Sequence, residues 1–490
     1  MRQLFPVLNV LGVVIALFSL TFAIPIGTSL YTADAALMAF VHAFGVSFGI
    51  GALMFGATYR QRRELAPRDG FLLVSLVWSV LPVVAAVPLV LYFRGVGVDL
   101  SLTDAYFEAM SGLTTTGATV LTGLDTLPYS INVWRCTLIW IGGMGILVLA
   151  VAILPMLGVG GSQVFRAETA GPMKDEKLTP RITGTAKGLY AIYMVVSLLC
   201  AVAYRLTGMS WYDAYCHMAA TIGLGGFSNR DAGFLAFDSI STEFVAIVFM
   251  TIAGINFATH FRAYRAKSLR TYWNCFEAKY YLTVMFGSGI IIGFLLYGEQ
   301  VYPTLSEAMR HAVFNTVSVA TTTGFASTDY AKWPLFAPVL MLALSSFVTS
   351  AGSTGGGMKM IRMVILVKQA RREFTRLLHP RAINPVRIGG QMIANHVVFS
   401  VLAFVLLYGA SLVILTMVML STGLEPLTAF TAVLATLNNT GPGLGDVVGP
   451  MGSYKGLTDV QTWICSFAML IGRLELFTVL VLFTRAFWRK

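Results

Sequence analysis

Four short stretches of this chain combine Thr, Asn and Gly in a way that could bind a bare monovalent cation. Each lies between a short apolar segment and an apolar segment of membrane-spanning length. Backbone carbonyls can replace the water around a cation when successive ones point inward, and glycine permits this because it can adopt positive φ. The residues that we assign to such a filter are Thr114, Thr115, Thr116 and Gly117; Thr221, Ile222, Gly223, Leu224 and Gly225; Thr321, Thr322, Thr323 and Gly324; and Asn438, Asn439, Thr440 and Gly441.

These stretches are expected to be four copies of one hairpin. A single Gly-Thr hairpin is more often an ordinary loop or helix contact, but four in register predict a pore surrounded by four repeats. We place the central glycines at Gly117, Gly225, Gly324 and Gly441. The second hairpin lacks the hydroxyls of the first and third, so the predicted filter is not fourfold alike.

A glycine-rich segment interrupts the apolar stretch that follows the third hairpin. Consecutive glycines unravel a helix, because each costs about 1 kcal/mol relative to Ala in a helix interior. We interpret the segment as a gate below the filter; the alternative is a kink used for close helix packing. A phosphate-binding loop is disfavoured, because that motif needs Gly-Lys-Ser/Thr after a strand. The segment consists of Gly352, Ser353, Thr354, Gly355, Gly356 and Gly357.

Two basic residues lie where a membrane protein rarely places them. Arg473 falls within the apolar stretch 465–483, where an arginine costs about 2.5 to 3.5 kcal/mol and usually faces a polar cavity. We interpret it as a positive barrier in the pore below the filter; the alternative is a salt bridge between helices. Lys359, beside the glycine-rich segment, has the same two interpretations. Glu475 is two residues from Arg473 and therefore points elsewhere on a helix.

The composition is that of an integral membrane protein. Hydrophobic residues make up 56% of the chain and charged residues 12%, with a mean hydropathy of +0.74. An ordinary soluble domain has roughly a quarter of its residues charged. Apolar runs near the length of about 20 residues that crosses the hydrocarbon core recur about ten times. The predicted fold class is therefore an all-α polytopic membrane protein.

The net charge of +11 does not indicate a nucleic-acid-binding protein, because the basic residues lie in loops at alternate membrane crossings. The positive-inside rule places these loops in the cytoplasm, where they bind anionic lipid or a partner. The hairpins fall in the intervening loops and face outward, so the four repeats run parallel, unlike those of inverted-repeat transporters. The basic loops contain Arg60, Arg62, Arg63 and Arg68; Lys174, Lys177, Arg181 and Lys187; Arg262, Arg265, Lys267 and Arg270; Lys368, Arg371, Arg372, Arg376, Arg381 and Arg387; and Arg485, Arg489 and Lys490.

Short re-entrant helices must position the hairpins. Their predicted starts place a cap-forming or acidic residue at the first turn, which suits a helix N-terminus. Each runs about ten to fifteen residues, too short to cross the membrane. Re-entrant backbone is tolerated only where it is buried or lines an aqueous cavity, and four copies around one axis satisfy that condition. The starts are Ser101, Ser210, Thr304 and Glu425.

We divide the chain into an accessory helix pair and four pore repeats. Each repeat consists of an outer helix, a pore helix, a filter loop and an inner helix. The predicted bounds are 1–69 for the accessory pair, and 70–184, 185–277, 278–389 and 390–490 for the repeats, with the gating loop in the third.

Other residues that could do chemistry show no organised pattern. The five cysteines are scattered, mostly in apolar segments, so neither a disulfide framework nor a metal cluster is expected. The six histidines have no ligand spacing. The sequence contains no nucleophile with its base and no nucleotide-binding motif, so we predict neither an enzyme nor an organic cofactor.

With these residues in view, the chain resembles the membrane subunits of Trk-type potassium uptake systems, in a superfamily that includes Ktr-type subunits. The resemblance covers nearly the whole length, and the two additional N-terminal helices are similar to the Trk branch. Its most specific stretches are 111–119, 142–145 leading into 152–155, 166–169, 352–357, 438–445 and 472–475.

The resemblance implies that K⁺ is the transported ion and that residues 352–357 and Arg473 form the gate. It implies a homodimer in a bacterial inner membrane, with one pore in each protomer. It also implies a cytosolic ring of regulatory, TrkA-like subunits with nucleotide-binding domains.

The predicted function is K⁺ uptake through a channel-like pore. The alternative is a symporter that couples K⁺ to H⁺ or Na⁺, which would need an acid buried at mid-membrane; Glu475 is the candidate. A membrane scaffold that docks soluble partners is a third possibility, but it leaves four outward hairpins and a buried arginine unexplained.

Overall fold

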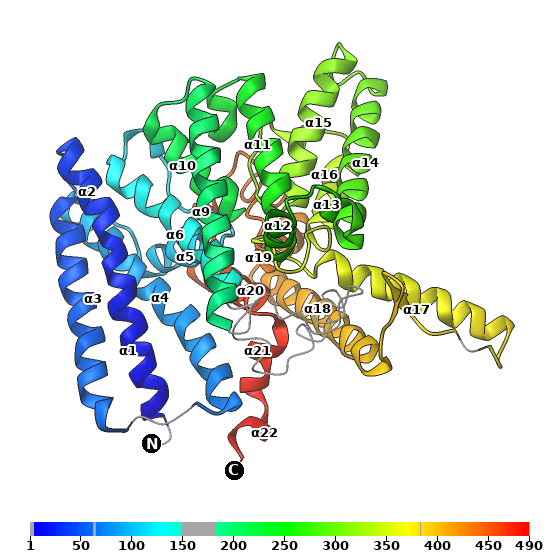
Figure 1. Ribbon diagram of the computed structural model, residues 1–490. Helices are drawn as coiled ribbons and strands as arrows, with labels where there is room; N and C mark the ends of the chain where they lie inside the picture. Colours follow the sequence, from blue (N-terminus) through cyan, green and yellow to red (C-terminus); the bar gives the residue numbers. More distant parts are fainter. Residues whose placement is uncertain (1–3, 62–64, 149–181, 383, 490) are drawn as a thin grey trace.

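The computed structural model of the chain describes residues 4–61, 65–148, 182–382 and 384–489, which are mainly α-helical (Figure 1). Within these residues, strands β1 (Arg387–Ile388) and β2 (Gln391–Met392) form a short antiparallel hairpin. This architecture agrees with the predicted all-α class. Several predicted features lie outside the described residues, namely the motifs 152–155 and 166–169 and the basic residues Arg62, Arg63, Lys174, Lys177, Arg181 and Lys490.

The first helices pack as a group at one side of the molecule. Helix α1 (Phe5–Ser19) continues through a 3₁₀ turn into α2 (Ala23–Thr32), and α3 (Leu37–Thr58) returns alongside them (Figure 1). Helices α1 and α3 approach closely because Gly12 and Gly51 face each other. A Cβ on Gly12 would lie 2.9 Å from the Gly51 carbonyl oxygen.

Asp34 joins this group to the rest of the chain. Its carboxylate lies between α2 and α3 and accepts hydrogen bonds from the backbone amide and the hydroxyl of Ser130, both at 3.0 Å. Ser130 stands in the first turn of α6 (Tyr129–Val148). The first three helices are thus tied to α6.

The remaining helices form the larger part of the molecule, which we call the pore body after its predicted role. They are α4 (Pro67–Gly95), α5 (Leu102–Leu113), α9 (Ile182–Leu206), α10 (Trp211–Gly223), α11 (Ile240–Ala253), α12 (Phe257–Ala266), α13 (Arg270–Asn274), α14 (Phe276–Gly298), α15 (Leu305–Ala320), α16 (Phe336–Ser345), α17 (Met360–Leu378), α18 (Asn395–Ser421), α19 (Pro426–Leu437), α20 (Asp459–Arg473), α21 (Leu476–Leu480) and α22 (Arg485–Trp488).

Among the described residues, six helices are long and apolar enough to span a membrane, or eight if two bent pairs each count as one span. This is fewer than the ten or so that the apolar runs predict, for two reasons. Helix α16 has only ten residues because the chain leaves the helix at Ser346. A second apolar run, which the sequence places at 136–157, continues beyond Val148, where the described residues stop.

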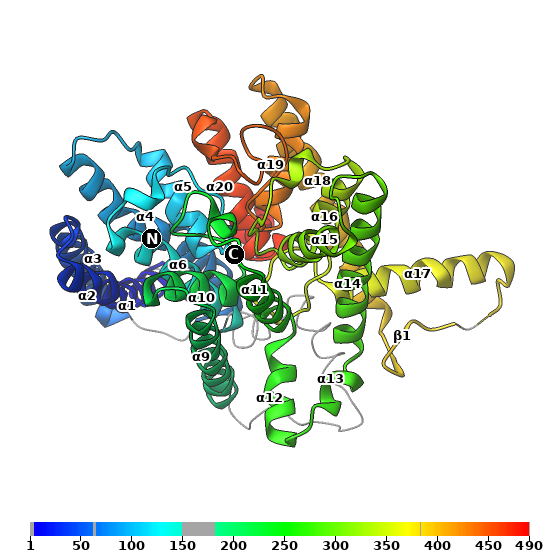
Figure 2. The ribbon, with the colours of Figure 1, turned by 90° about the horizontal axis from the view of Figure 1, so that it is seen from above.

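Four short helices, α5, α10, α15 and α19, lie around one centre when the molecule is seen from above (Figure 2). Each begins with a side-chain cap that accepts a backbone amide, as the sequence predicts. The caps are Ser101 to Asp104 (2.9 Å), Ser210 to Asp213 (3.0 Å), Thr304 to Glu307 (3.3 Å) and Glu425 to Thr428 (2.8 Å). The last turns of these helices are buried, so all four point their C-terminal ends into the protein.

The inner helices of three hairpins are broken. Helices α11 and α12 meet at an angle of 91°, and α20 meets α21 at 113°. Between α16 and α17 the chain runs through irregular backbone at 346–359. Helix α17 then projects away from the pore body (Figure 1). The breaks bring non-helical segments close to the hairpins.

Candidate functional site

Each short helix ends in the same turn of backbone. Two residues of each turn have positive φ: Thr115 and Gly117 (53° and 82°), Leu224 and Gly226 (52° and 65°), Thr322 and Gly324 (62° and 85°), and Asn439 and Gly441 (54° and 92°). The amide between them bonds to the carbonyl five residues earlier: Thr116 to Ser111 (2.8 Å), Gly225 to Ala220 (3.0 Å), Thr323 to Ser318 (2.8 Å) and Thr440 to Ala435 (2.8 Å). The four hairpins therefore share one conformation.

The second hairpin has a different register from the one read off the sequence. The glycine equivalent to Gly117 is Gly226, while Gly225 corresponds to Thr116. The spacing from the helix cap could have revealed this, because Gly117, Gly226 and Gly441 each lie sixteen positions after their N-cap residue. Two adjacent glycines made the sequence alone ambiguous.

The four hairpins contact one another in a closed ring. A Cβ on any of the four glycines would overlap a carbonyl oxygen of the next hairpin. The contacts are Gly117 with Gly225, Gly226 with Thr323, Gly324 with Thr440, and Gly441 with Thr116. Backbone therefore packs on backbone around the ring, which only glycine permits at these positions.

A hollow lies at this ring. All four positive-φ glycines line it, together with residues that follow them in each hairpin and the outer-loop residues Arg230 and Asp231. Backbone of all four hairpins and charged residues of the outer loop thus line the same hollow. Among the described residues, no three His, Cys, Asp or Glu side chains lie close enough together to hold a metal ion, so backbone and Thr or Asn oxygens are the groups available to a cation here.

Different side chains brace the hairpins behind the ring. In the first and third, two Thr hydroxyls bond at 2.8 Å, Thr114 with Thr116 and Thr321 with Thr323. In the fourth, Asn438 accepts from Tyr408 at 2.7 Å and donates to Ser345 and Ser346 at 3.0 Å. These predicted filter residues are buried.

The second hairpin uses apolar packing instead. Ile139 of α6 fills the space behind it, and its Cγ2 would lie 2.5 Å from a Cβ on Gly223 and 2.7 Å from one on Gly225. Thr221, which we assigned to the filter, lies one position before the equivalent of Leu113 and bonds to Tyr204 at 2.7 Å. The predicted asymmetry of the ring therefore has a structural basis.

The glycine-rich segment lies directly against the helix-side ends of three hairpins. Thr354 Oγ1 donates to the Ile222 carbonyl at 2.9 Å, and the Gly356 amide donates to Thr322 Oγ1 at 2.8 Å. A Cβ on Gly356 would overlap the Asn438 carbonyl oxygen. The segment therefore lies below the ring, on the side away from the outer loops.

Arg473 and Lys359 converge on the same segment. Arg473 is 4% exposed, and its Nη1 donates to the Thr354 carbonyl at 2.9 Å. Lys359 Nζ bonds to the Gly355 carbonyl. In the part of the chain that the structure describes, neither side chain forms an ion pair with a carboxylate. The salt bridge between helices instead joins Arg362 and Glu475 at 2.7 Å.

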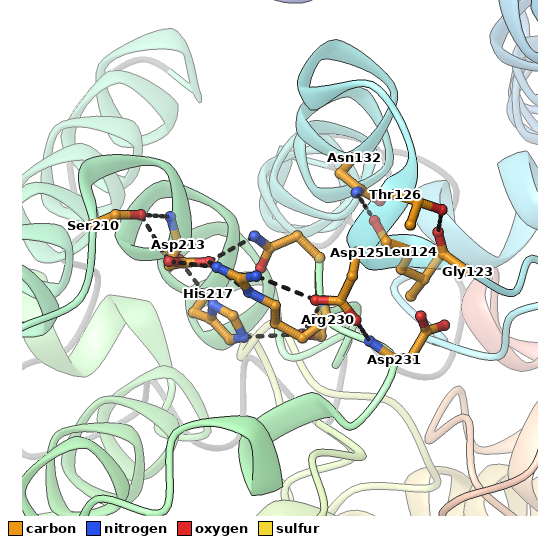
Figure 3. Close-up of polar contacts among 12 residues, drawn as sticks. Gly123, Leu124, Asp125, Thr126, Asn132, Ser210, Asp213, His217, Arg230 and Asp231 are labelled. Atoms are coloured by element: carbon orange, nitrogen blue, oxygen red, sulfur yellow. Dashed lines mark hydrogen bonds and ion pairs between the residues drawn. The ribbon is translucent and has the colours of Figure 1, made fainter.

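Sequence reasoning missed a polar network in the outer loops. Arg230 lies between Asp213 and Asp125 and pairs with them at 3.0 and 3.2 Å (Figure 3). The bond to Asp213 raises the pKa of Arg230. Burial acts to raise the pKa of Asp125, but bonds from the Asp231 amide and Arg230 outweigh it and hold the pKa below its usual range. The sequence contains these charged residues but does not indicate which of them pair, because they are far apart in the chain.

A family model described as TrkH, "Cation transport protein", matches residues 36–490. The chain is 46% identical over 484 residues to the Trk system potassium uptake protein TrkH of Halomonas elongata, covering 99% of both. It is 42% identical to the protein of that name from Escherichia coli, covering 98% of this chain and 99% of that one. It is also similar to the crystal structure of the potassium transporter TrkH from Vibrio parahaemolyticus, with a TM-score of 0.91 and 41% identity over 99% of this chain and all of that one.

Proposed function

The chain belongs to the TrkH family of cation transport proteins, and from this premise we propose that it conducts K⁺ through a filter made by its four hairpins. It is a multi-pass protein of the inner membrane, part of a Trk potassium uptake system, and not an enzyme. Membership of a potassium uptake system implies that K⁺ is the transported ion. The proposal concerns the pathway and its control.

The closed ring of hairpins is the observation that best supports the proposed filter. The ring places carbonyl-bearing backbone of four segments around one centre, with Gly117, Gly226, Gly324 and Gly441 at equivalent positions. Carbonyl dipoles arranged in this way replace the hydration shell of K⁺. The proposed division into the accessory pair 1–69 and the repeats 70–184, 185–277, 278–389 and 390–490 gives each repeat one quarter of the ring.

Residues 352–357, Lys359 and Arg473 act as the gate in this proposal. The segment lies below the ring, and the charged side chains of Arg473 and Lys359 donate hydrogen bonds to its carbonyls. A fixed positive charge at that depth repels K⁺ that has passed the filter. Opening would require the segment and the Arg473 guanidinium to leave the ion path together.

A channel is favoured over a symporter that couples K⁺ to H⁺ or Na⁺. The symporter needs an acid at mid-membrane that is free to bind H⁺ or Na⁺. The candidate, Glu475, instead forms an ion pair with Arg362 at 2.7 Å. The membrane potential supplies about 2.3 kcal/mol per charge per 100 mV for inward K⁺ movement. Uptake through a pore therefore needs no coupling site.

We also propose the partners that the family implies. A second copy of the chain would bind along α17, which projects from the pore body and exposes Phe374, Leu377 and Leu378 to 66%, 78% and 77%. A cytosolic ring of TrkA-like subunits with nucleotide-binding domains would dock on the basic loops, which also contact anionic lipid. Nucleic acid is not a partner.

The test is ion flux into liposomes that contain the purified protein. K⁺, Rb⁺, Na⁺ and Li⁺ are compared, each with and without a H⁺ or Na⁺ gradient. The channel predicts K⁺ and Rb⁺ flux that follows the membrane potential and ignores those gradients. Flux that depends strictly on a H⁺ or Na⁺ gradient would reject the channel and make the protein a coupled transporter.

A further inference from the structure

A buried ion pair lies behind the first two hairpins. Glu108 of α5 and Arg135 of α6 are each 1% exposed, and Arg135 Nε lies 2.7 Å from Glu108 Oε1. Burying such a pair has a large desolvation cost, and apolar residues would hold two helices equally well. The pair is therefore expected to do something that apolar packing cannot.

The first hairpin receives bonds from both partners. Glu108 Oε2 accepts the Val120 amide at 2.9 Å, and both carboxylate oxygens accept the Thr119 hydroxyl at 3.0 Å. Arg135 Nη2 contacts the same hydroxyl oxygen at 3.1 Å. These residues directly follow Gly117 and Ala118, so the pair fixes the outer part of this hairpin.

Arg135 extends the contact to the second hairpin. Its Nη1 donates to the Ser228 carbonyl at 3.0 Å, and its guanidinium carbon lies 4.4 Å from the centre of the Phe227 ring. Both residues immediately follow Gly226. One planar side chain with several donors thus connects two neighbouring quarters of the ring, which is geometry that Lys cannot reproduce.

Each of the other pore helices also holds the chain segment that follows its own hairpin. Helix α10 does so partly with a carboxylate, because Asp213 accepts a hydrogen bond from Asn229 at 2.8 Å, and the other contacts are made by uncharged side chains. His217 bonds to the Ser228 hydroxyl at 3.1 Å, Asn315 accepts the Ser327 amide at 3.2 Å, and Thr431 accepts the Leu444 amide at 2.9 Å. Val120, Ser327 and Leu444 occupy the same place, three residues after the ring glycine. The ion pair is the variant of this brace that reaches a second hairpin.

We propose that Glu108 and Arg135 are positioning residues that set the carbonyl geometry of the first and second hairpins and thereby the preference for K⁺ over Na⁺. This rests on the proposed filter. Discrimination between ions of one charge depends on the number and placement of the carbonyl dipoles. The second hairpin lacks the paired hydroxyls of the first and third, so it depends most on a brace from outside.

The test uses two variants of the pair and one matched control. Arg135→Lys keeps the charge but loses the simultaneous contacts to Thr119 and Ser228, and Glu108→Gln keeps the shape but leaves Arg135 without its counterion. The control is Arg310→Gln, which breaks the outer pair of Arg310 with Glu243 at 2.8 Å, away from the hollow. The readout is the ratio of K⁺ to Na⁺ flux in liposomes, together with the melting temperature and the monodispersity of each variant.

We expect the flux ratio to fall about tenfold in Arg135→Lys and Glu108→Gln, because a site whose support moves by a fraction of an ångström loses its geometry. Arg310→Gln should retain the wild-type ratio even if its melting temperature falls. Folded, active Arg135→Lys and Glu108→Gln proteins with the wild-type ratio would overturn the inference and leave the filter intact. A wild-type protein that does not prefer K⁺ would instead reject the filter proposal itself.

Discussion

Arg473 Nη1 donates a hydrogen bond to the carbonyl oxygen of Thr354 at 2.9 Å, across 119 positions of sequence. The bond joins the end of α20, in the proposed fourth repeat, to the glycine-rich segment of the proposed third repeat. Its Nε and Nη2 find no partner among the described residues, so much of the charge stays available to act on the ion path. In the proposed gate, this single side chain both holds the segment and places a positive charge beside it.

Replacing Arg473 with Ala should increase K⁺ flux. Hydrogen bonds to charged groups contribute about 1.5 to 3 kcal/mol, which corresponds to roughly a tenfold to hundredfold shift toward the open state. Flux per reconstituted protein measures this. Arg473→Lys is the control, because it keeps the charge and should stay near the wild-type rate; equal rates in wild type and Arg473→Ala would contradict the gate.

Substitution of the ring glycines should distinguish the two registers of the second hairpin. Gly226→Ala should abolish flux, because φ is 65° and the added Cβ would overlap the Thr323 carbonyl. Gly225→Ala should retain part of the flux, since its closest contact is the Ile139 side chain, which can shift. Flux measured on both variants decides the matter, and the opposite ranking would restore Gly225 as the central glycine.

The ion pair of Arg362 and Glu475 should stabilise the closed gate. Arg362 follows the glycine-rich segment, and Glu475 lies at the bend between α20 and α21. Arg362→Gln and Glu475→Gln should each increase flux, and the double variant should add little to either. We expect a coupling energy of about 1 to 3 kcal/mol from the double-mutant cycle. Fully additive effects would show that the two residues act independently.

Asp34 should make stability depend on pH at the acid end. Burial acts to raise its pKa, but hydrogen bonds from Ser29, Ser130 and the Ala36 amide outweigh this and hold the pKa below its usual 3.8. A lowered folded-state pKa contributes stability that is present above 3.8 and is lost as pH falls through the folded value.

Asp34→Asn should therefore lower the melting temperature at pH 7 and have little effect near pH 2. The loss at pH 7 is about 1 kcal/mol, because the site is partly exposed and solvent screens it. Thermal unfolding of both proteins in detergent at the two pH values measures this. A deficit of the same size at both would contradict the assignment to the ionised carboxylate.

Much of the membrane architecture follows from local sequence. The caps at Ser101, Ser210 and Thr304 and the glycines after each short helix depend on residues within a few turns, so propensity and spacing predict them. The apolar run around α16 predicts a longer helix than the structure has, because it continues into residues 346–349, which leave the helix. Hydropathy measures apolar length and does not register where a helix stops.

The sequence by itself determined the helical class, the four hairpins and the unusual position of Arg473, because periodicity, glycine and buried charge are local properties. Only the tertiary structure decided that Gly226 completes the ring, that Thr354 receives Arg473, and that Glu108 and Arg135 support two hairpins at once. These contacts join residues that are far apart in the chain. Their partners depend on how the helices pack around one centre, and no local pattern specifies that arrangement.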